Sequence, residues 1–176
     1  MNLESKIYEL SFELSEAIDK NTLQKLLGVL ASDGVYAMWV YAMDKLDLKF
    51  FENTEEMKKL KLFELLKIIG ELDKYSTKKM DFDDLLNNVA NLTKEINELN
   101  NKINTLKREI KNSNKGKIHE KKELDKIVKN KIKKRNQKLN QYFQELAQDL
   151  EKLLFMKDLL ERVFIYALYH AKAKGD

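Results

Sequence analysis

The stretch FDDLLNNVANLTKEINELNNKINTLKREI, residues 82–110, decides the fold of this chain. Apolar residues recur in it at alternating steps of three and four over four heptads, which is the pattern of a coiled-coil helix. The positions are Phe82, Leu85, Val89, Leu92, Ile96, Leu99, Ile103, Leu106 and Ile110. A helix of this length extends about 45 Å at 1.5 Å per residue, so its apolar seam needs a partner over most of that distance.

The partner is predicted to be the segment that follows. The turn residues Asn112-Ser113-Asn114-Lys115-Gly116 break the first helix, and a weaker apolar pattern then returns along residues 118–146. Because the two lengths match and the loop is short, an antiparallel coiled-coil hairpin is expected. Lys131 and Arg135 stand at seam positions, where long basic side chains can bury their stems and expose their charges. The alternative is an arm that does not pack fully near its middle.

The segments on either side of the hairpin predict a compact helical bundle. Apolar spacing indicates a helix over Leu3–Lys20, and residues 23–46 are apolar nearly all round, with a turn expected at Ser32-Asp33-Gly34. Asn21 or Thr22 is the expected cap before residue 23, and one helix is expected from a capping box at residues 53–56 to about Leu72. Tyr36, Trp39, Val40 and Met43 are expected to share a core face.

The predicted fold class is therefore all-α. We expect a bundle core made of residues 1–78 and 147–176, with the coiled-coil hairpin, residues 79–146, inserted before the last helix. The strong helix formers Leu, Lys and Glu dominate the chain, while Pro is absent and only five Gly occur.

The sequence lacks the motifs that mark the sites of many enzymes. It has no Cys, no Gly-rich phosphate loop, no His-Glu-x-x-His pair and no nucleophile elbow. The two histidines, His119 and His170, fall on different predicted elements, so a shared metal site is not expected. We therefore expect a protein that is not an enzyme, with no cofactor, no metal and no small-molecule substrate.

The longest uncharged apolar run, residues 34–43, is about half as long as a bilayer span requires. Residues 2–20 carry charges throughout, unlike a secretory signal. No membrane partner is expected, and the absence of Cys favours a cytoplasmic location.

Positive charge gathers in the returning arm of the hairpin. Residues 115–138 hold eleven Lys or Arg and three acids, a net charge of +8 in a chain whose total is +4. The densest part carries six basic residues and no acid, and it supplies the candidate RNA-binding residues Lys129, Lys131, Lys133, Lys134, Arg135 and Lys138. Phosphate backbones are the expected partner of such a run, and a simply solvated lysine-rich arm is the equal alternative. Because the run contains no aromatic residue, base stacking is not expected there.

The bundle segments also carry a resemblance. Ala31-Ser32-Asp33-Gly34-Val35, the apolar Tyr36–Met43 and Lys45 resemble the central glycine turn and following helix of the small helical subunit of type III-B (Cmr) CRISPR effector complexes. Leu60–Leu72 is similar to the middle helix of that family, and Leu153–Lys172 to its closing helix. The chain departs from the family in lacking a Pro before the turn and in carrying the hairpin where a short connection is usual.

The resemblance implies a non-catalytic structural subunit of an RNA-guided antiviral complex. Copies of such subunits stack and line the channel in which guide and target RNA pair. It implies as partners the other subunits of the ribonucleoprotein, further copies of this chain, and guide and target RNA. Of its residues, only Lys45 carries over, as an RNA backbone contact.

Two other functions remain open. The hairpin alone is sufficient for a coiled-coil adaptor that binds a protein helix, and the heptads of residues 82–110 are the strongest pattern in the chain. A nucleic-acid-gripping arm, like the helical arm of some tRNA synthetases, is a third possibility that rests on analogy of fold.

Overall fold

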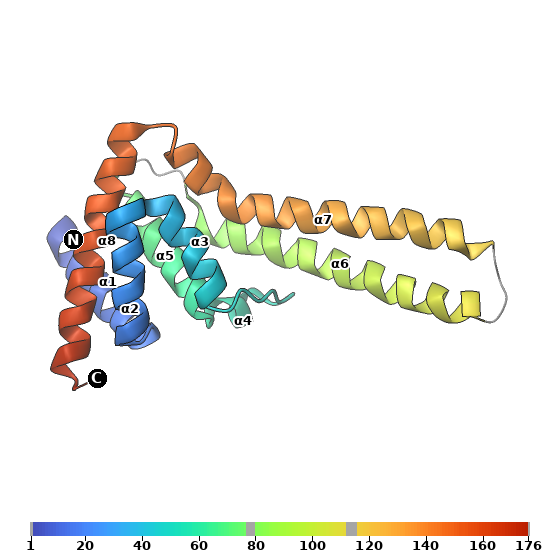
Figure 1. Ribbon diagram of the computed structural model, residues 1–176, viewed down its shortest axis with the longest axis horizontal. Helices are drawn as coiled ribbons and strands as arrows, with labels where there is room; N and C mark the ends of the chain where they lie inside the picture. The colour runs from blue at the N-terminus through green and yellow to red at the C-terminus, as the bar shows by residue number, and fades with distance from the viewer. Residues whose placement is uncertain (1, 77–79, 112–115, 176) are drawn as a thin grey trace. The chain divides into compact units, whose positions relative to one another are not determined.

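The computed structural model describes residues 2–76, 80–111 and 116–175, which form helices and no strand (Figure 1). The chain is all-α, as predicted. The helices are α1 (Leu3–Ala17), α2 (Lys20–Asp33), α3 (Val35–Lys45), α4 (Thr54–Lys58), α5 (Lys61–Asp73), α6 (Phe82–Lys111), α7 (Lys117–Leu146) and α8 (Leu150–Ala173).

The chain forms two compact units. The first consists of Met1–Lys49, Glu55–Phe82 and Gln141–Asp176, and the second of Phe50–Thr54 and Asp83–Asn140. The predicted division into a bundle core of residues 1–78 and 147–176 and an inserted hairpin of residues 79–146 stays a prediction. Most of the turn predicted at 112–116 lies outside the described residues.

The first unit has an apolar core to which α1, α2, α3, α5 and α8 contribute. Helices α1 and α2 lie alongside α8 (Figure 1). Within this core Trp39 of α3 stacks on Phe143 of α7, with ring centroids 4.7 Å apart and planes 14° apart. Both side chains are almost fully buried. An aromatic pair of this kind contributes about 0.5–1.5 kcal/mol beyond the area it buries.

Gly34 forms the predicted turn between α2 and α3. Its backbone has φ 92° and ψ −176°, a conformation that residues with a Cβ avoid. The turn lets two short apolar helices lie in the core where the sequence shows one long apolar run.

Three local predictions about the first unit are wrong. Asp19, not Asn21 or Thr22, caps α2, because its carboxylate accepts the backbone N–H of Thr22 at 2.9 Å and the hydroxyl of Thr22 at 2.7 Å. The helix expected over 53–72 is broken between α4 and α5 at Lys59-Leu60. Tyr36 and Val40 are 42% and 44% exposed, so the predicted core face of α3 is correct for Trp39 but not for them.

A buried carboxylate lies in the first unit. Asp73 is fully buried and accepts the hydroxyl of Tyr142 at 2.9 Å and the backbone N–H of Met80 at 3.2 Å. Burial, together with the nearby Asp73, raises the pKa of Tyr142. The phenol therefore stays neutral throughout the physiological pH range and can donate a hydrogen bond to the carboxylate.

The second unit contains most of α6 and α7, which lie side by side in opposite directions (Figure 1). Ile96 and Ile103 of α6 and Val128 of α7 form one buried apolar cluster, against which Leu99, Leu124 and Ile132 pack. The pairs Glu95–Lys131 and Glu109–Lys117 run in opposite order along the two helices, as an antiparallel arrangement requires. The supercoiled knobs-into-holes packing of a coiled coil stays a prediction.

Residues 50–54 form a short strap on this hairpin. The centre of the Phe50 ring lies 3.6 Å from the guanidinium carbon of Arg135. The side-chain amide of Asn97 donates a hydrogen bond to the carboxylate of Glu52 at 2.8 Å. The strap thus contacts both helices, although it is about thirty residues earlier in the chain than α6.

Candidate nucleic-acid interface

The candidate interface lies on α7, whose two sides differ in character. One side carries the apolar residues Leu124, Val128 and Ile132, which pack against α6. Since successive residues of a helix turn by about 100°, residues three and four apart share a face and the remaining positions of α7 point elsewhere. The distribution of its basic residues over these two sides decides which of them can meet a ligand.

Two of the predicted RNA-binding residues are engaged within the hairpin. Lys131 bonds the carboxylate of Glu95 at 2.5 Å. The guanidinium of Arg135 covers the Phe50 ring and donates to the Thr93 hydroxyl at 3.1 Å. Burial lowers the pKa of Arg135, and its Nε has no hydrogen-bond partner in the described part of the chain. These two residues direct their charged groups toward α6 and the strap.

The other four candidates of the hairpin lie away from those contacts. Lys129, Lys133 and Lys134 are exposed and Lys138 is half-buried. None of the four makes an ion pair with a described residue. Their positive charge is therefore not neutralised by the hairpin itself.

Two further lysines continue the line of Lys129 and Lys133. Lys122 and Lys126 are exposed and precede Lys129 at steps of four and three, with Lys133 another four residues on. We call Lys122, Lys126, Lys129 and Lys133 the lysine stripe. At 1.5 Å per residue it extends about 16 Å along one face of α7.

One lysine of the stripe forms an ion pair with a neighbouring acid on α7. Lys126 bonds Glu123 at 3.1 Å and lowers the pKa of that carboxyl. Both side chains are exposed, and exposed pairs of this kind contribute little to stability. A polyanion can therefore compete for Lys126 at little cost.

Sequence reasoning missed Lys122 and Lys126 because it searched for the densest run of basic residues. Charge density selects residues 129–138 whatever side of the helix they occupy. The signal that finds the stripe is the offset of each lysine from the seam residues Leu124, Val128 and Ile132. Lys122 and Lys126 lie two residues from the nearest seam residue, and Lys129 and Lys133 lie one residue away, offsets that turn a side chain about 100° to 200° around the helix.

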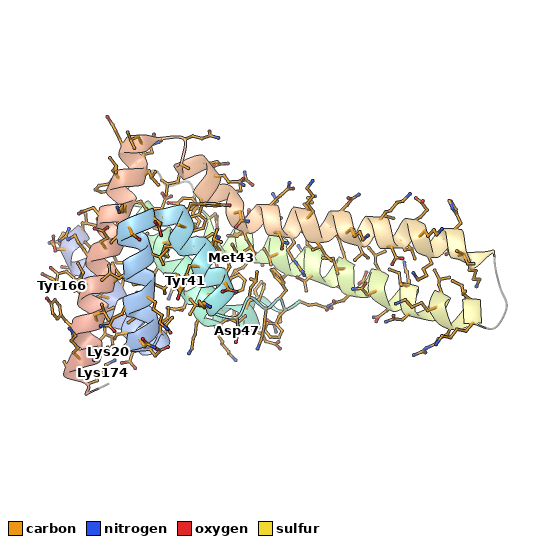
Figure 2. All side chains as sticks on the ribbon, viewed as in Figure 1. Lys20, Tyr41, Met43, Asp47, Tyr166 and Lys174 are labelled. Atoms are coloured by element: carbon orange, nitrogen blue, oxygen red, sulfur yellow. The ribbon has the colours of Figure 1, made fainter. Side chains whose placement is uncertain are left out.

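Lys45 belongs to the first unit and is distant in sequence from the lysine stripe. It ends α3, its side chain is 52% exposed, and it pairs with the adjacent Asp44 at 3.2 Å. Its ammonium is 5.8 Å from the centre of the Tyr41 ring. Figure 2 shows Tyr41, Met43 and Asp47 around this end of α3. The ion pair with Asp44 partly offsets the charge that Lys45 would offer to a phosphate.

The histidines and acidic residues of the described part of the chain do not gather into a metal site. Residues 2–76, 80–111 and 116–175 contain no group of three His, Asp or Glu placed to hold a metal ion. His119 is exposed, and His170 packs edge-on against Phe12 with ring centroids 5.6 Å apart. Within the same residues no helix combines the length and apolarity needed to cross a bilayer.

No family model matches this sequence, and no curated protein and no solved structure matches it.

Proposed function

We propose that this chain is a non-catalytic RNA-binding protein that holds the phosphate backbone of RNA against the lysine stripe of α7. The observation that carries the proposal is four exposed lysines at steps of four, three and four on one helix face. Three of them, Lys122, Lys129 and Lys133, make no ion pair with a described residue.

A stripe of ammonium groups suits a polyphosphate chain. Each lysine that neutralises a phosphate releases condensed counterions, which supplies affinity that does not depend on sequence. No Phe, Tyr or Trp lies within residues 117–141 to stack on a base. Binding should therefore read the backbone rather than the bases.

The type III complex is the setting that we propose for this activity. It is supported by the Gly34 turn, by the apolar helix α3 that ends at Lys45, and by α5 and α8, which cover the segments whose sequences resemble the middle and closing helices of that family. In this proposal the chain is a structural subunit that assembles in several copies, with Lys45 as a second contact to guide or target RNA.

The direct experiment compares RNA binding by the wild-type chain and by a variant in which all four stripe lysines become glutamine. With a fluorescent single-stranded RNA of mixed sequence at low salt, the variant should bind about tenfold or more weakly, because several phosphate contacts are lost. A DNA strand of the same sequence, measured beside it, shows whether the 2′-hydroxyl matters.

The matched control changes four exposed lysines of the first unit, Lys25, Lys49, Lys59 and Lys61, to glutamine. This control has the same net charge as the stripe variant and leaves α7 intact. Equal affinities of the stripe variant and the control would contradict the proposal, because net charge alone would then explain binding.

A coiled-coil adaptor is the second candidate function. It is supported by two isoleucines of α7, Ile118 and Ile127, that are 40% and 42% exposed and could contact a protein helix. Ile127→Ser, which adds no charge beside the stripe, should weaken capture of such a partner and leave RNA affinity unchanged. The stripe variant should have the opposite effects.

A further inference from the structure

Helices α1 and α8 of the first unit lie parallel and in register. Along one edge of the pair, Glu4 contacts Arg162, Tyr8 contacts Tyr166, Phe12 contacts His170 and Glu16 contacts Lys174. Each step is four residues on both helices, so the edge has aromatic pairs in the middle and an ion pair at each end. Figure 2 shows Tyr166 and Lys174 projecting from α8 along this edge.

The aromatic residues of this edge are largely open to solvent. Tyr8 is 51% exposed, Phe12 50% and Tyr169 62%, and Ile165 on the same side of α8 is 40% exposed. We call these four residues and Tyr166 the aromatic face. A fully exposed aromatic side chain presents about 150–250 Å², so the face leaves on the order of 400 Å² of apolar surface in water. That is within the range of the largest, often functional, patches on monomeric proteins.

One acid and one base on α8 lie at equal distances on either side of Ile165. Asp158 stands seven residues before Ile165 and Lys172 seven residues after it, and both are exposed. Seven residues are two helical turns, so the three positions lie on one line along α8. If a second α8 crosses the first antiparallel with Ile165 at the two-fold axis, Asp158 of each copy faces Lys172 of the other.

We propose that the aromatic face is the interface of a two-fold symmetric homodimer, centred on Ile165 of α8 and flanked by Tyr8 and Phe12 of α1. An isologous interface needs a self-complementary surface, and the acid–apolar–base order of Asp158, Ile165 and Lys172 meets that need. The apolar surface supplies about half of the roughly 800 Å² that each partner buries in a standard interface, and the charged rim supplies the rest. The dimer does not depend on RNA binding by α7.

The first test uses the absence of cysteine from this chain. In Ile165→Cys the new thiol faces its own copy across the axis, so a mild oxidant should convert most of the protein to a covalent dimer. Asp158→Cys and Lys172→Cys place each thiol about 20 Å from its copy, which is too far for a disulfide. Neither should cross-link alone, whereas a mixture of the two should.

The second test exchanges the charges and measures the dimer dissociation constant by sedimentation equilibrium. Asp158→Lys and Lys172→Asp should each weaken the dimer about tenfold or more, since like charges then face each other at two places. The double exchange should restore affinity to within about threefold of wild type, because each pair is again of opposite sign. All positions are exposed, and circular dichroism verifies that each variant is folded.

A wild-type chain that stays monomeric at high concentration would overturn the proposal. So would cross-linking of Lys172→Cys alone as readily as Ile165→Cys, because the axis would then lie elsewhere. Charge exchanges that leave the dissociation constant unchanged would also contradict the interface.

Discussion

The buried carboxylate of Asp73 depends on the hydroxyl of Tyr142, 2.9 Å away. Tyr142→Phe keeps the ring and removes the donor, so it should lower the free energy of unfolding by about 1–3 kcal/mol. Urea denaturation at pH 7 measures this difference. An unchanged stability would mean that the hydrogen bond is offset by relaxation of the core.

The same pair predicts a pH dependence. Since the pKa of Tyr142 is raised in the folded chain, its phenol stays neutral where tyrosines of the unfolded chain, with a pKa of about 10, already ionise. The stability difference between the wild type and Tyr142→Phe should be constant up to about pH 9. It should then shrink as pH rises through about 10, by no more than about 1.4 kcal/mol per pH unit. A difference that grows with pH would contradict this reasoning.

Substitution by alanine should have opposite effects on stability at Gly28, inside α2, and at Gly34, which ends that helix. Gly34 has φ 92°, so Gly34→Ala should destabilise the chain by about 1–3 kcal/mol. Gly28 lies inside α2 with no atom within 4 Å of an added Cβ, so Gly28→Ala should stabilise it by about 0.5–1 kcal/mol. Thermal unfolding of the two variants tests both signs. Equal effects would show that the turn at Gly34 imposes no special backbone requirement.

At the scale of the element, Arg135 and Lys133 are two residues apart on α7 and have different environments. Arg135→Gln should destabilise the chain by about 1–2 kcal/mol, because the contact with Phe50 and the hydrogen bond to Thr93 are lost. Lys133→Gln should leave stability within about 0.5 kcal/mol of wild type, as surface changes usually do, and should weaken RNA binding. The two variants carry the same net charge.

Chemical denaturation and RNA titration of both variants make the comparison. Equal RNA affinities, both reduced, would show that net charge rather than position on α7 determines binding. A stability loss confined to Lys133→Gln would contradict the contacts assigned to the hairpin.

The helices themselves could be predicted where apolar spacing is regular. Val89, Ile96, Ile103 and Leu106, which set the heptads of α6, are all buried. The places where a helix ends and the next begins depend on the contacts of one or two residues, which apolar spacing does not reveal. One break lies between Leu146, the end of α7, and Leu150, the start of α8, where the carboxylate of Asp149 accepts the backbone N–H of Lys152.

The candidate site was harder to predict than the helices. The run 129–138 directs attention to α7, yet Lys131 and Arg135 are engaged within the hairpin and Lys122 and Lys126 lie outside the run. The partners that engage Arg135, Phe50 and Thr93, are about 85 and 42 residues away in the sequence. The density of charge along the sequence does not reveal such contacts. The angle between each basic residue and the apolar seam does show which side of α7 that residue occupies.

At the scale of the whole molecule, the two proposals use different parts of the chain. RNA is proposed to contact the lysine stripe of the second unit, and a second copy is proposed to contact the aromatic face of the first. A dimer would double the number of lysine stripes per particle, and avidity would then raise the apparent affinity for long RNA without any new contact. Asp158→Lys should therefore weaken binding of long RNA more than binding of a short oligonucleotide, in the same titration.

The measurement that tests the central claim most directly is the salt dependence of RNA binding by the wild type and by the variant lacking the four stripe lysines. For single-stranded nucleic acid, each phosphate contact contributes about 0.7 to the slope of log affinity against log salt concentration. Our account predicts a slope about 2 to 3 units shallower for the variant, and the full wild-type slope for the control altered at Lys25, Lys49, Lys59 and Lys61. Equal slopes for all three proteins would show that RNA does not bind along the lysine stripe.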